Sequence, residues 1–230
     1  ASYVAYLFAG GESTADTAKS VRFDGSGDYL NTTSSSSDLS FGTGDFTIEF
    51  WIRPYGSLDN KGVFQISDTS GGVASGSSYS SSIVMYTADE STSGTGTAGA
   101  LPALRKGQWQ HIAISRSSGT IKAFYNGIEH ASGNDTVDYS NGYIAIGNYW
   151  SAGYEIDADF SNFRVVKGTA VYTSSFKPPT EPLTSISGTV LLCCNNSSVT
   201  GSTVTPATLN SQGDPTASTD SPFDDPAGFV

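Results

Sequence analysis

The stretch that decides the fold is residues 46–53, FTIEFWIR, followed by Pro54. Apolar and polar side chains alternate along it, and a period of two is typical of a β-strand with one face in a core. The four apolar residues at the even positions are therefore expected inside the protein. The odd positions, from Thr47 onward, are expected to face a groove or solvent.

Short stretches with the same period follow along most of the chain, and no segment shows the period of a helix. Turn signals separate them; Asn126-Gly127, for example, is typical of a tight hairpin turn. Many short strands without helical intervals predict an all-β, antiparallel two-sheet sandwich. The expected strands are residues 20–23, 29–30, 63–66, 83–86, 109–115, 121–125, 143–146, 160–166 and 189–193.

The charge balance excludes several classes of partner. The chain of 230 residues has 11 Lys and Arg against 22 Asp and Glu, a formal net charge of −11. A nucleic-acid binder needs a basic face, and an anionic membrane surface attracts basic segments, so neither partner is expected. No apolar run approaches the length of a membrane span, so we expect no membrane insertion.

Taken together, the segments resemble the laminin G-like, concanavalin A-like jelly roll over residues 18–194. The resemblance implies an antiparallel jelly-roll sandwich of the lectin and glucanase kind. It rests on residues 21–25 with 27–30, similar to the opening hairpin of that fold; on residues 44–52, similar to its next long strand; on residues 109–114 with 121–127, similar to its central hairpin; and on residues 160–166, similar to its returning strand.

Three parts are expected along the chain. Residues 1–12 are expected as an N-terminal strand, the end of an upstream module, and residues 13–194 as the jelly roll. Residues 195–230 are expected as a C-terminal extension rich in Ser, Thr, Pro and Asp, with an edge strand near residues 203–209 and an extended tail from Asp214.

Two stretches of low complexity, residues 67–82 and 87–99, are expected as surface loops because they are mostly Ser, Thr, Gly and Ala. The adjacent Cys193 and Cys194 lie in an expected strand, where neighbouring side chains point to opposite faces. We therefore expect two buried free thiols there.

A narrower resemblance concerns residues 167–180, KGTAVYTSSFKPPT, with residues 191–194 and 210–216. These stretches are similar to the tail of such modules in large phage and marine-virus structural proteins. The resemblance implies a virion appendage, namely a tail fibre, tail-associated or capsid-decorating protein, whose module meets the host surface. A host cell-surface glycan is the hypothesised ligand, other virion structural proteins are expected partners, and homo-oligomers are common in such fibres. The alternative setting is a secreted or cell-surface protein.

Four aspartates are candidate metal ligands. Asp24 and Asp28 flank a Gly-rich turn, and Asp157 and Asp159 precede the returning strand. The resemblance implies one structural Ca²⁺, which prefers carboxylate and carbonyl oxygens. The alternative is ordinary turn chemistry, since Asp side chains bond to their own backbone in turns.

An aromatic loop is the candidate glycan site. Asn148, Tyr149, Trp150 and Tyr154 stand close together in a Gly-containing loop between two expected strands. Exposed aromatic rings in such a loop indicate a binding surface. The alternative is that Trp150 packs as a lid on the sandwich or on a neighbouring subunit.

The other aromatic rings and histidines are expected to be structural. Trp51, Trp109 and His111 are predicted to be packed rings with satisfied polar tips. His130 is the only other histidine, so a His-rich transition-metal site is excluded.

The row Glu155, Asp157 and Asp159 is the strongest enzymatic pattern, because alternate residues of a strand project from one face. Laminarinase-like hydrolases share the resembled fold and carry a similar row, but here the last position is not Glu, and the row precedes the returning strand. We therefore predict a non-catalytic binding module and no enzyme. The alternatives are a purely structural decoration domain and a glycoside hydrolase.

Overall fold

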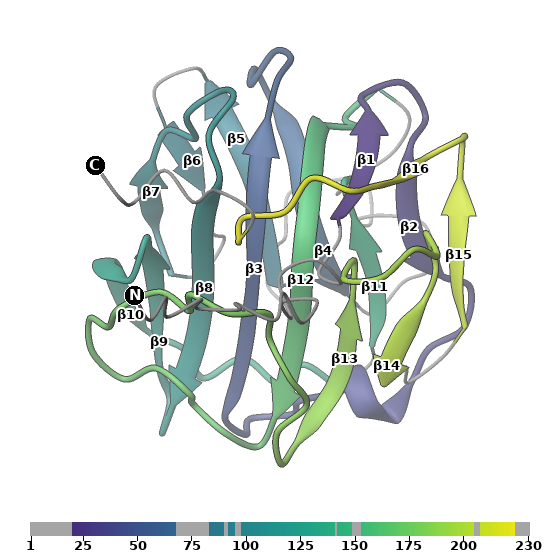
Figure 1. Ribbon diagram of the computed structural model, residues 1–230. Helices are drawn as coiled ribbons and strands as arrows, with labels where there is room; N and C mark the ends of the chain where they lie inside the picture. Colours follow the sequence, from purple (N-terminus) through teal and green to yellow (C-terminus); the bar gives the residue numbers. More distant parts are fainter. Residues whose placement is uncertain are drawn as a thin grey trace, which may run out of the picture.

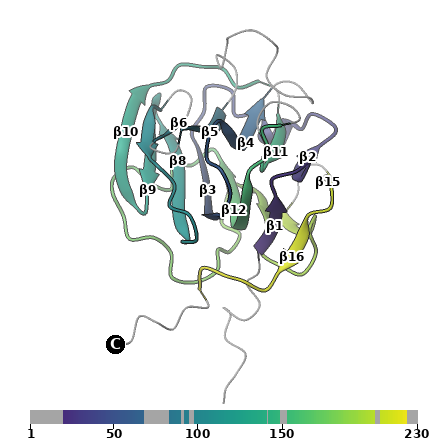
Figure 2. The same cartoon turned by 90° about the horizontal axis from the view of Figure 1, so that it is seen from above.

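In a computed structural model of the chain, the described residues form two antiparallel β-sheets stacked face to face (Figure 1, Figure 2). This architecture confirms the predicted all-β two-sheet sandwich. The described part of the chain has one helix, the 3-10 turn η1 (Ser37–Leu39), and it contains no helix long and apolar enough to cross a membrane. The structure describes residues 20–67, 83–89, 92–94, 98–140, 142–148, 153–204 and 208–223.

The larger sheet, sheet A, has the strand order β10-β9-β8-β3-β12-β1-β16. Its long strand β12 pairs with β1 along its first half and with β13 along its second, and β13 pairs with β14. The strands of sheet A are β1 (Ser20–Asp24), β3 (Phe46–Pro54), β8 (Gln110–Ser117), β9 (Thr120–Tyr125), β10 (Ile128–Asn134), β12 (Asp157–Lys167), β13 (Thr189–Cys193), β14 (Ser202–Val204) and β16 (Thr216–Ser218).

The smaller sheet, sheet B, has the order β15-β2-β11-β4-β5-β6-β7. Its strands are β2 (Tyr29–Thr32), β4 (Lys61–Ser67), β5 (Ile83–Asp89), β6 (Thr92–Gly94), β7 (Ala100–Pro102), β11 (Tyr143–Ile146) and β15 (Leu209–Gln212).

The core lies between the two sheets. Phe46, Ile48, Phe50 and Ile52 of β3 are fully buried, which confirms the face predicted from their alternation. Phe50 meets Phe64 of β4 edge to face, with ring centroids 5.6 Å apart. Aromatic pairs of this geometry add to the stabilisation from buried area, so they hold sheet A against sheet B.

The opposite face of β3 is also covered. Residues 168–188, which connect β12 to β13, cross the outer face of sheet A (Figure 1). The Val171 backbone N–H donates to Thr47 Oγ1 at 2.8 Å, and the Tyr172 hydroxyl donates to Glu49 Oε2 at 2.8 Å. The expectation of a groove or solvent is therefore wrong for Thr47 and Glu49, which are fully buried under this crossing segment.

Glu49 is the centre of a buried polar network. Arg164 Nε donates to Glu49 Oε1 at 3.0 Å, and His111 Nε2 lies 3.3 Å from Glu49 Oε2. Burial raises the pKa of Glu49, but the His111 hydrogen bond and the Arg164 charge outweigh burial and bring that pKa below its ordinary value. The ionised carboxylate is therefore the form that this network holds.

The opening strands do not form the hairpin that the sequence resemblance implied. β1 pairs with β12 and β16 in sheet A, whereas β2 pairs with β11 and β15 in sheet B. The turn from Asp24 to Asp28 thus carries the chain from one sheet to the other. The expected central hairpin is confirmed: β8 pairs with β9, and Asn126-Gly127 turns the chain into β10 with positive φ at both residues.

The C-terminal segment is part of the sandwich. β15 pairs with β2, β16 pairs with β1, and β14 pairs with β13. The segment therefore adds one strand to sheet B and two strands to sheet A. The expectation of an extended tail from Asp214 is wrong for residues 216–218, because they form β16. After β16 the chain runs along the outer side of sheet A as far as Phe223 (Figure 2).

Two smaller expectations have different outcomes. Residues 87–99 were expected as a loop, but they include the end of β5 and all of β6, since Ser and Thr side chains suit strands as well as turns. Cys193 and Cys194 are buried and unpaired, which confirms the expected free thiols.

We expect Arg164→Met to lower the free energy of unfolding by about 3–5 kcal/mol, because it leaves the buried Glu49 carboxylate without its guanidinium partner. The double variant Glu49→Leu, Arg164→Met should lose less stability than this single variant, since it leaves no unpaired carboxylate at this site. Urea unfolding followed by tryptophan fluorescence measures the free energy of unfolding of both variants. Arg105→Met, which changes an exposed arginine, is the control and should unfold with nearly the wild-type free energy. A double variant as unstable as the single one would contradict this account.

Candidate functional site

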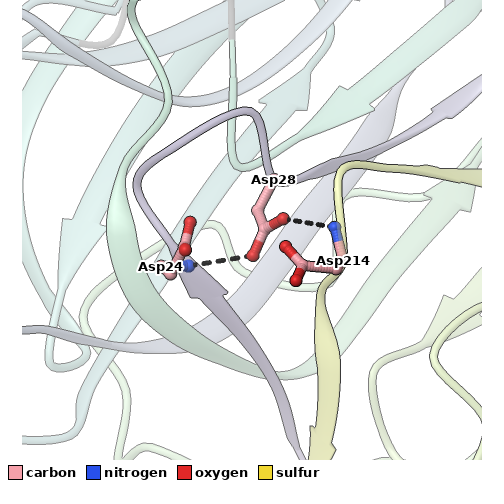
Figure 3. A group of neighbouring side chains, drawn as sticks. All are labelled: Asp24, Asp28 and Asp214. Atoms are coloured by element: carbon pink, nitrogen blue, oxygen red, sulfur yellow. Dashed lines mark hydrogen bonds between the residues drawn. The ribbon is translucent and has the colours of Figure 1, made fainter.

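Three carboxylates lie close together at the edge of the sandwich where the chain passes from one sheet to the other. One oxygen each of Asp24, Asp28 and Asp214 lies within 4.8 Å of the others (Figure 3). Asp24 and Asp28 bound the turn between β1 and β2, and Asp214 lies in the turn between β15 and β16. Because β1 pairs with β16 and β2 pairs with β15, the two turns lie side by side. We call these three residues the acidic group.

Asp28 joins the two turns. Its Oδ2 accepts a hydrogen bond from the Asp24 backbone at 3.1 Å, and its Oδ1 accepts one from the Asp214 backbone at 2.8 Å (Figure 3). Gly213 is needed for this approach, because it has a φ of +69° and a Cβ there would lie 2.2 Å from Asp28 Oδ1. Asp28 is only 2% exposed, whereas Asp24 and Asp214 are exposed.

The electrostatics of the acidic group favour a cation. Burial raises the pKa of Asp28, the two backbone hydrogen bonds lower it, and the charges of Asp24 and Asp214 raise it further, so the net shift is upward. A bound cation would remove the repulsion that these carboxylates exert on one another.

The spacing and chemistry of the acidic group fit a hard metal ion. Ligands on opposite sides of a Ca²⁺ ion, each about 2.4 Å from it, are about 4.8 Å apart. The acidic group offers only oxygen donors, and two of its carboxylates are open to solvent. These residues can therefore hold a metal ion.

The other two predicted metal ligands lie outside this group. Asp157 pairs with Arg22. Asp159 accepts hydrogen bonds from Arg53 Nη2 at 2.7 Å and from the Tyr55 hydroxyl at 2.6 Å. The structure thus brings together Asp24 and Asp28 of the predicted set, whereas Asp157 and Asp159 form ion pairs with Arg22 and Arg53 on the outer face of sheet A.

Asp214 is the ligand that sequence reasoning missed. It lies 186 residues from Asp28 and falls in the segment expected as a tail. The available signal was the dipeptide Gly213-Asp214, which repeats the Gly and Asp chemistry of the turn from Asp24 to Asp28. Only the pairing of the edge strands shows that these turns meet.

The acidic row does not supply a free acid and a free nucleophile. Glu155 is 4% exposed, and its Oε2 accepts from the Gly153 backbone at 2.8 Å. Asp157 and Asp159 are both held by arginines. A glycosidase needs one carboxyl group kept protonated beside another free to react, and the described contacts of this row do not provide that division.

The aromatic loop is described only at its ends, since Tyr149 and Trp150 lie outside the described residues. Asn148 is buried and Tyr154 is half-buried. The Tyr154 carbonyl accepts from the Gly62 backbone at 2.7 Å. This loop connects β11 of sheet B to β12 of sheet A, and Asp157 of β12 stands opposite Asp24 of β1. Its C-terminal end therefore reaches the same edge as the turn from Asp24 to Asp28.

The ring residues that were predicted to be structural lie on the outer face of sheet A. The expectation of satisfied polar tips is wrong for Trp51 and Trp109, because both indole N–H groups are buried with no acceptor among the described residues. His111 is fully buried and meets the Trp51 ring edge-on at 5.2 Å. Trp109 is half-buried, with the Arg53 guanidinium 4.9 Å from its ring centroid.

Comparison with known families gives one clear match. Residues 24–171 match the sequence model of the concanavalin A-like lectin/glucanases superfamily. No curated protein sequence matches the chain.

Two solved structures show the same fold. The native heptameric SAP-like pentraxin from Limulus polyphemus has a TM-score of 0.58 and 10% identity, covering 91% of this chain and 98% of the pentraxin. A protein from Bacteroides ovatus, provisionally assigned as carbohydrate binding, has a TM-score of 0.58 and 15% identity, covering 88% of this chain and 60% of its own. At these identities the likeness concerns the fold alone, and the chain spans 60% of the length of the Bacteroides protein.

We expect the acidic group to bind a hard divalent cation, with Ca²⁺ as the probe. Asp24→Asn and Asp214→Asn should each weaken binding on the order of tenfold, because each removes a charged ligand. Affinity should fall as the pH drops through the pKa of Asp28. Because that pKa is raised, the fall should occur at a higher pH than for an ordinary aspartate, whose pKa is about 3.9. Isothermal titration calorimetry measures both effects.

The matched control for this titration is Asp138→Asn, which changes an exposed aspartate outside the acidic group. Equal affinities for Asp24→Asn, Asp214→Asn and the control would exclude the acidic group as the binding site.

Proposed function

The chain belongs to the concanavalin A-like lectin/glucanase superfamily, and from this premise we propose that it is a non-catalytic carbohydrate-binding module. The proposed ligand site is the edge that carries the acidic group and the described C-terminal end of the aromatic loop. The observation that carries the proposal is the pair of exposed carboxylates, Asp24 and Asp214, fixed on either side of the buried Asp28.

We assign one Ca²⁺ ion to the acidic group. Asp24, Asp28 and Asp214 would hold it, with carbonyl oxygens of the Gly-rich turn completing a shell of oxygen ligands. When bound, the ion would supply positive charge to which sugar hydroxyl oxygens coordinate. Asp28 keeps both turns in register for it, since each of its oxygens bonds one turn.

The aromatic loop supplies the apolar part of the proposed site. A sugar ring presents C–H groups that pack on aromatic rings, while its hydroxyls need amide or carboxylate partners. Asn148, Tyr149, Trp150 and Tyr154 offer both kinds of contact. The described ends of the loop support this placement, because they lead to the edge that carries the acidic group.

The partners of the three carboxylates in the acidic row support binding without catalysis. Asp157 and Asp159 are engaged by Arg22 and Arg53, and Glu155 bonds to the backbone of its own loop. A free carboxylate next to a protonated carboxyl group would be required for hydrolysis.

We expect purified protein to bind a subset of glycans on an array in the presence of Ca²⁺, and to lose that binding with a chelator. Tyr149→Ala, Trp150→Ala and Asp214→Asn should each reduce the signal at least tenfold, because each removes an aromatic or a cation contact. Asp138→Asn is the control that keeps it. Released reducing sugar, measured on the bound glycans, should stay at the level of buffer alone.

If the protein binds no glycan either with or without Ca²⁺, the proposed function is contradicted. A structural role, with the aromatic loop as an assembly contact, would then be favoured. Release of reducing sugar would instead establish a hydrolase.

We further propose that the module belongs to a virion appendage that meets a host cell-surface glycan. Residues 167–180, which carry the resemblance to viral modules, form much of the segment that crosses sheet A. Tyr172 and Phe176 in this segment stack with centroids 3.6 Å apart, so this part of the resemblance concerns residues that close the fold.

Antibodies raised against the protein test this setting. They should label virus particles in electron microscopy and block their adsorption to cells. Labelling of bacterial surfaces alone would place the protein on a cell instead.

A further inference from the structure

The outer face of sheet A holds a pocket that is separate from the acidic group. Its volume is about 530 Å³, within the usual range for small-ligand sites. Three segments far apart in sequence line it: Arg53 at the end of β3, the residues before β8, and the residues after β16. The lining residues are Arg53, Gly107, Gln108, Trp109, Asp220, Ser221 and Pro222.

The C-terminal wall of this pocket is fixed by specific contacts. The Ser20 hydroxyl donates to the Asp220 carbonyl at 2.7 Å, and Arg53 pairs with the Asp220 carboxylate. Ser221 is 5% exposed and accepts from the Phe223 backbone at 3.2 Å. The Phe223 ring meets Trp51 edge-on at 5.9 Å. These contacts hold the segment after β16 in one position against sheet A.

The opposite wall combines an aromatic ring with polar groups. The loop before β8 is held by the Gly107 N–H, which donates to the Pro54 carbonyl at 2.8 Å. Trp109 and Pro222 supply apolar surface, while Gln108 and Asp220 are exposed and can bond hydroxyl groups. The Trp109 indole N–H is buried without an acceptor in the described residues, so the ring contributes its apolar surface to the pocket.

The charge of the pocket selects among ligands. Arg53 is the one cation of the lining, and it is shared between Asp159 and Asp220. Among the lining residues, the positive charge of Arg53 is matched by the negative charge of Asp220, so the pocket has no net charge with which to attract phosphate, sulfate or carboxylate ligands. An aromatic wall with an amide and a carboxylate at its rim instead suits a neutral ring rich in hydroxyls.

We propose that this pocket is a second carbohydrate-binding site, which takes a neutral sugar unit and needs no cation. The inference rests on the proposed function for its ligand class, but it uses none of the residues of the acidic group or of the aromatic loop. The segment after β16 thereby has a binding role in addition to its role as an edge of the sandwich.

Tryptophan indole resonances distinguish the two sites, because the chain has three tryptophans and each reports a different place. Trp109 lies in the pocket, Trp150 belongs to the aromatic loop, and Trp51 packs beneath Phe223. The protein is labelled with ¹⁵N-tryptophan, and the resonances are assigned with Trp→Phe variants. It is then titrated with lactose, maltose and cellobiose, once with Ca²⁺ and once with chelator.

We expect at least one of these sugars to shift the Trp109 resonance in both conditions. Gln108→Ala and Asp220→Asn should each weaken that response about tenfold, because each removes a hydrogen-bonding partner. Lys106→Ala changes an exposed neighbour that does not line the pocket, and it should leave the response unchanged.

A Trp150 shift with Ca²⁺ and no Trp109 shift would overturn this inference and leave the proposed function intact. A Trp109 shift in chelator without any Trp150 shift would support the pocket and count against the site at the acidic group. The pocket is not a sugar site if none of the three resonances shifts in either condition. The same conclusion follows if the Trp109 resonance shifts equally in the wild type and in Gln108→Ala and Asp220→Asn.

Discussion

The carboxylate of Asp28 bonds the backbone of two turns that stand 186 residues apart, and much of the molecule depends on this junction. On one side it holds Asp24, where β1 ends, and on the other it holds Asp214, which leads into β16. The turn on each side moves the chain between sheets, so a single buried side chain couples both sheets at one edge. Both candidate sites follow from it. The acidic group lies at this junction. The chain continues from the junction into β16, and the segment after β16 forms one wall of the pocket.

A second constraint is the covering of sheet A. Residues 168–188 cross its outer face at the level of Glu49, and the segment after β16 crosses it nearer Trp51. Burying Glu49 is costly unless its oxygens are bonded, and Arg164, His111 and Tyr172 supply those bonds. The face of the sheet is therefore closed around Glu49 and hollowed at the other end of β3, beside Arg53.

The partners of the carboxylates distinguish the acids engaged by arginines from the proposed cation ligands. Asp157 and Asp159 alternate along β12 in a pattern that resembles a catalytic row, yet arginines from β1 and β3 engage both of them. Asp24 and Asp214 are exposed and are held next to a third acid whose pKa is already raised. Burial and the charges of the two neighbouring acids raise that pKa, and a cation bound to the acidic group would offset both effects.

The sequence by itself determined the class of fold and much of the core. Alternation in residues 46–53 predicts which face of β3 is buried, and Asn126-Gly127 predicts the turn after β9, because both signals are local. Local signals do not say which strand lies beside which. The tertiary structure alone decided that β1 and β2 belong to different sheets and that Thr47 and Glu49 are covered. It also brought Asp214 to Asp28 and closed a pocket with Asp220, since long-range strand pairing joins segments that no sequence period connects.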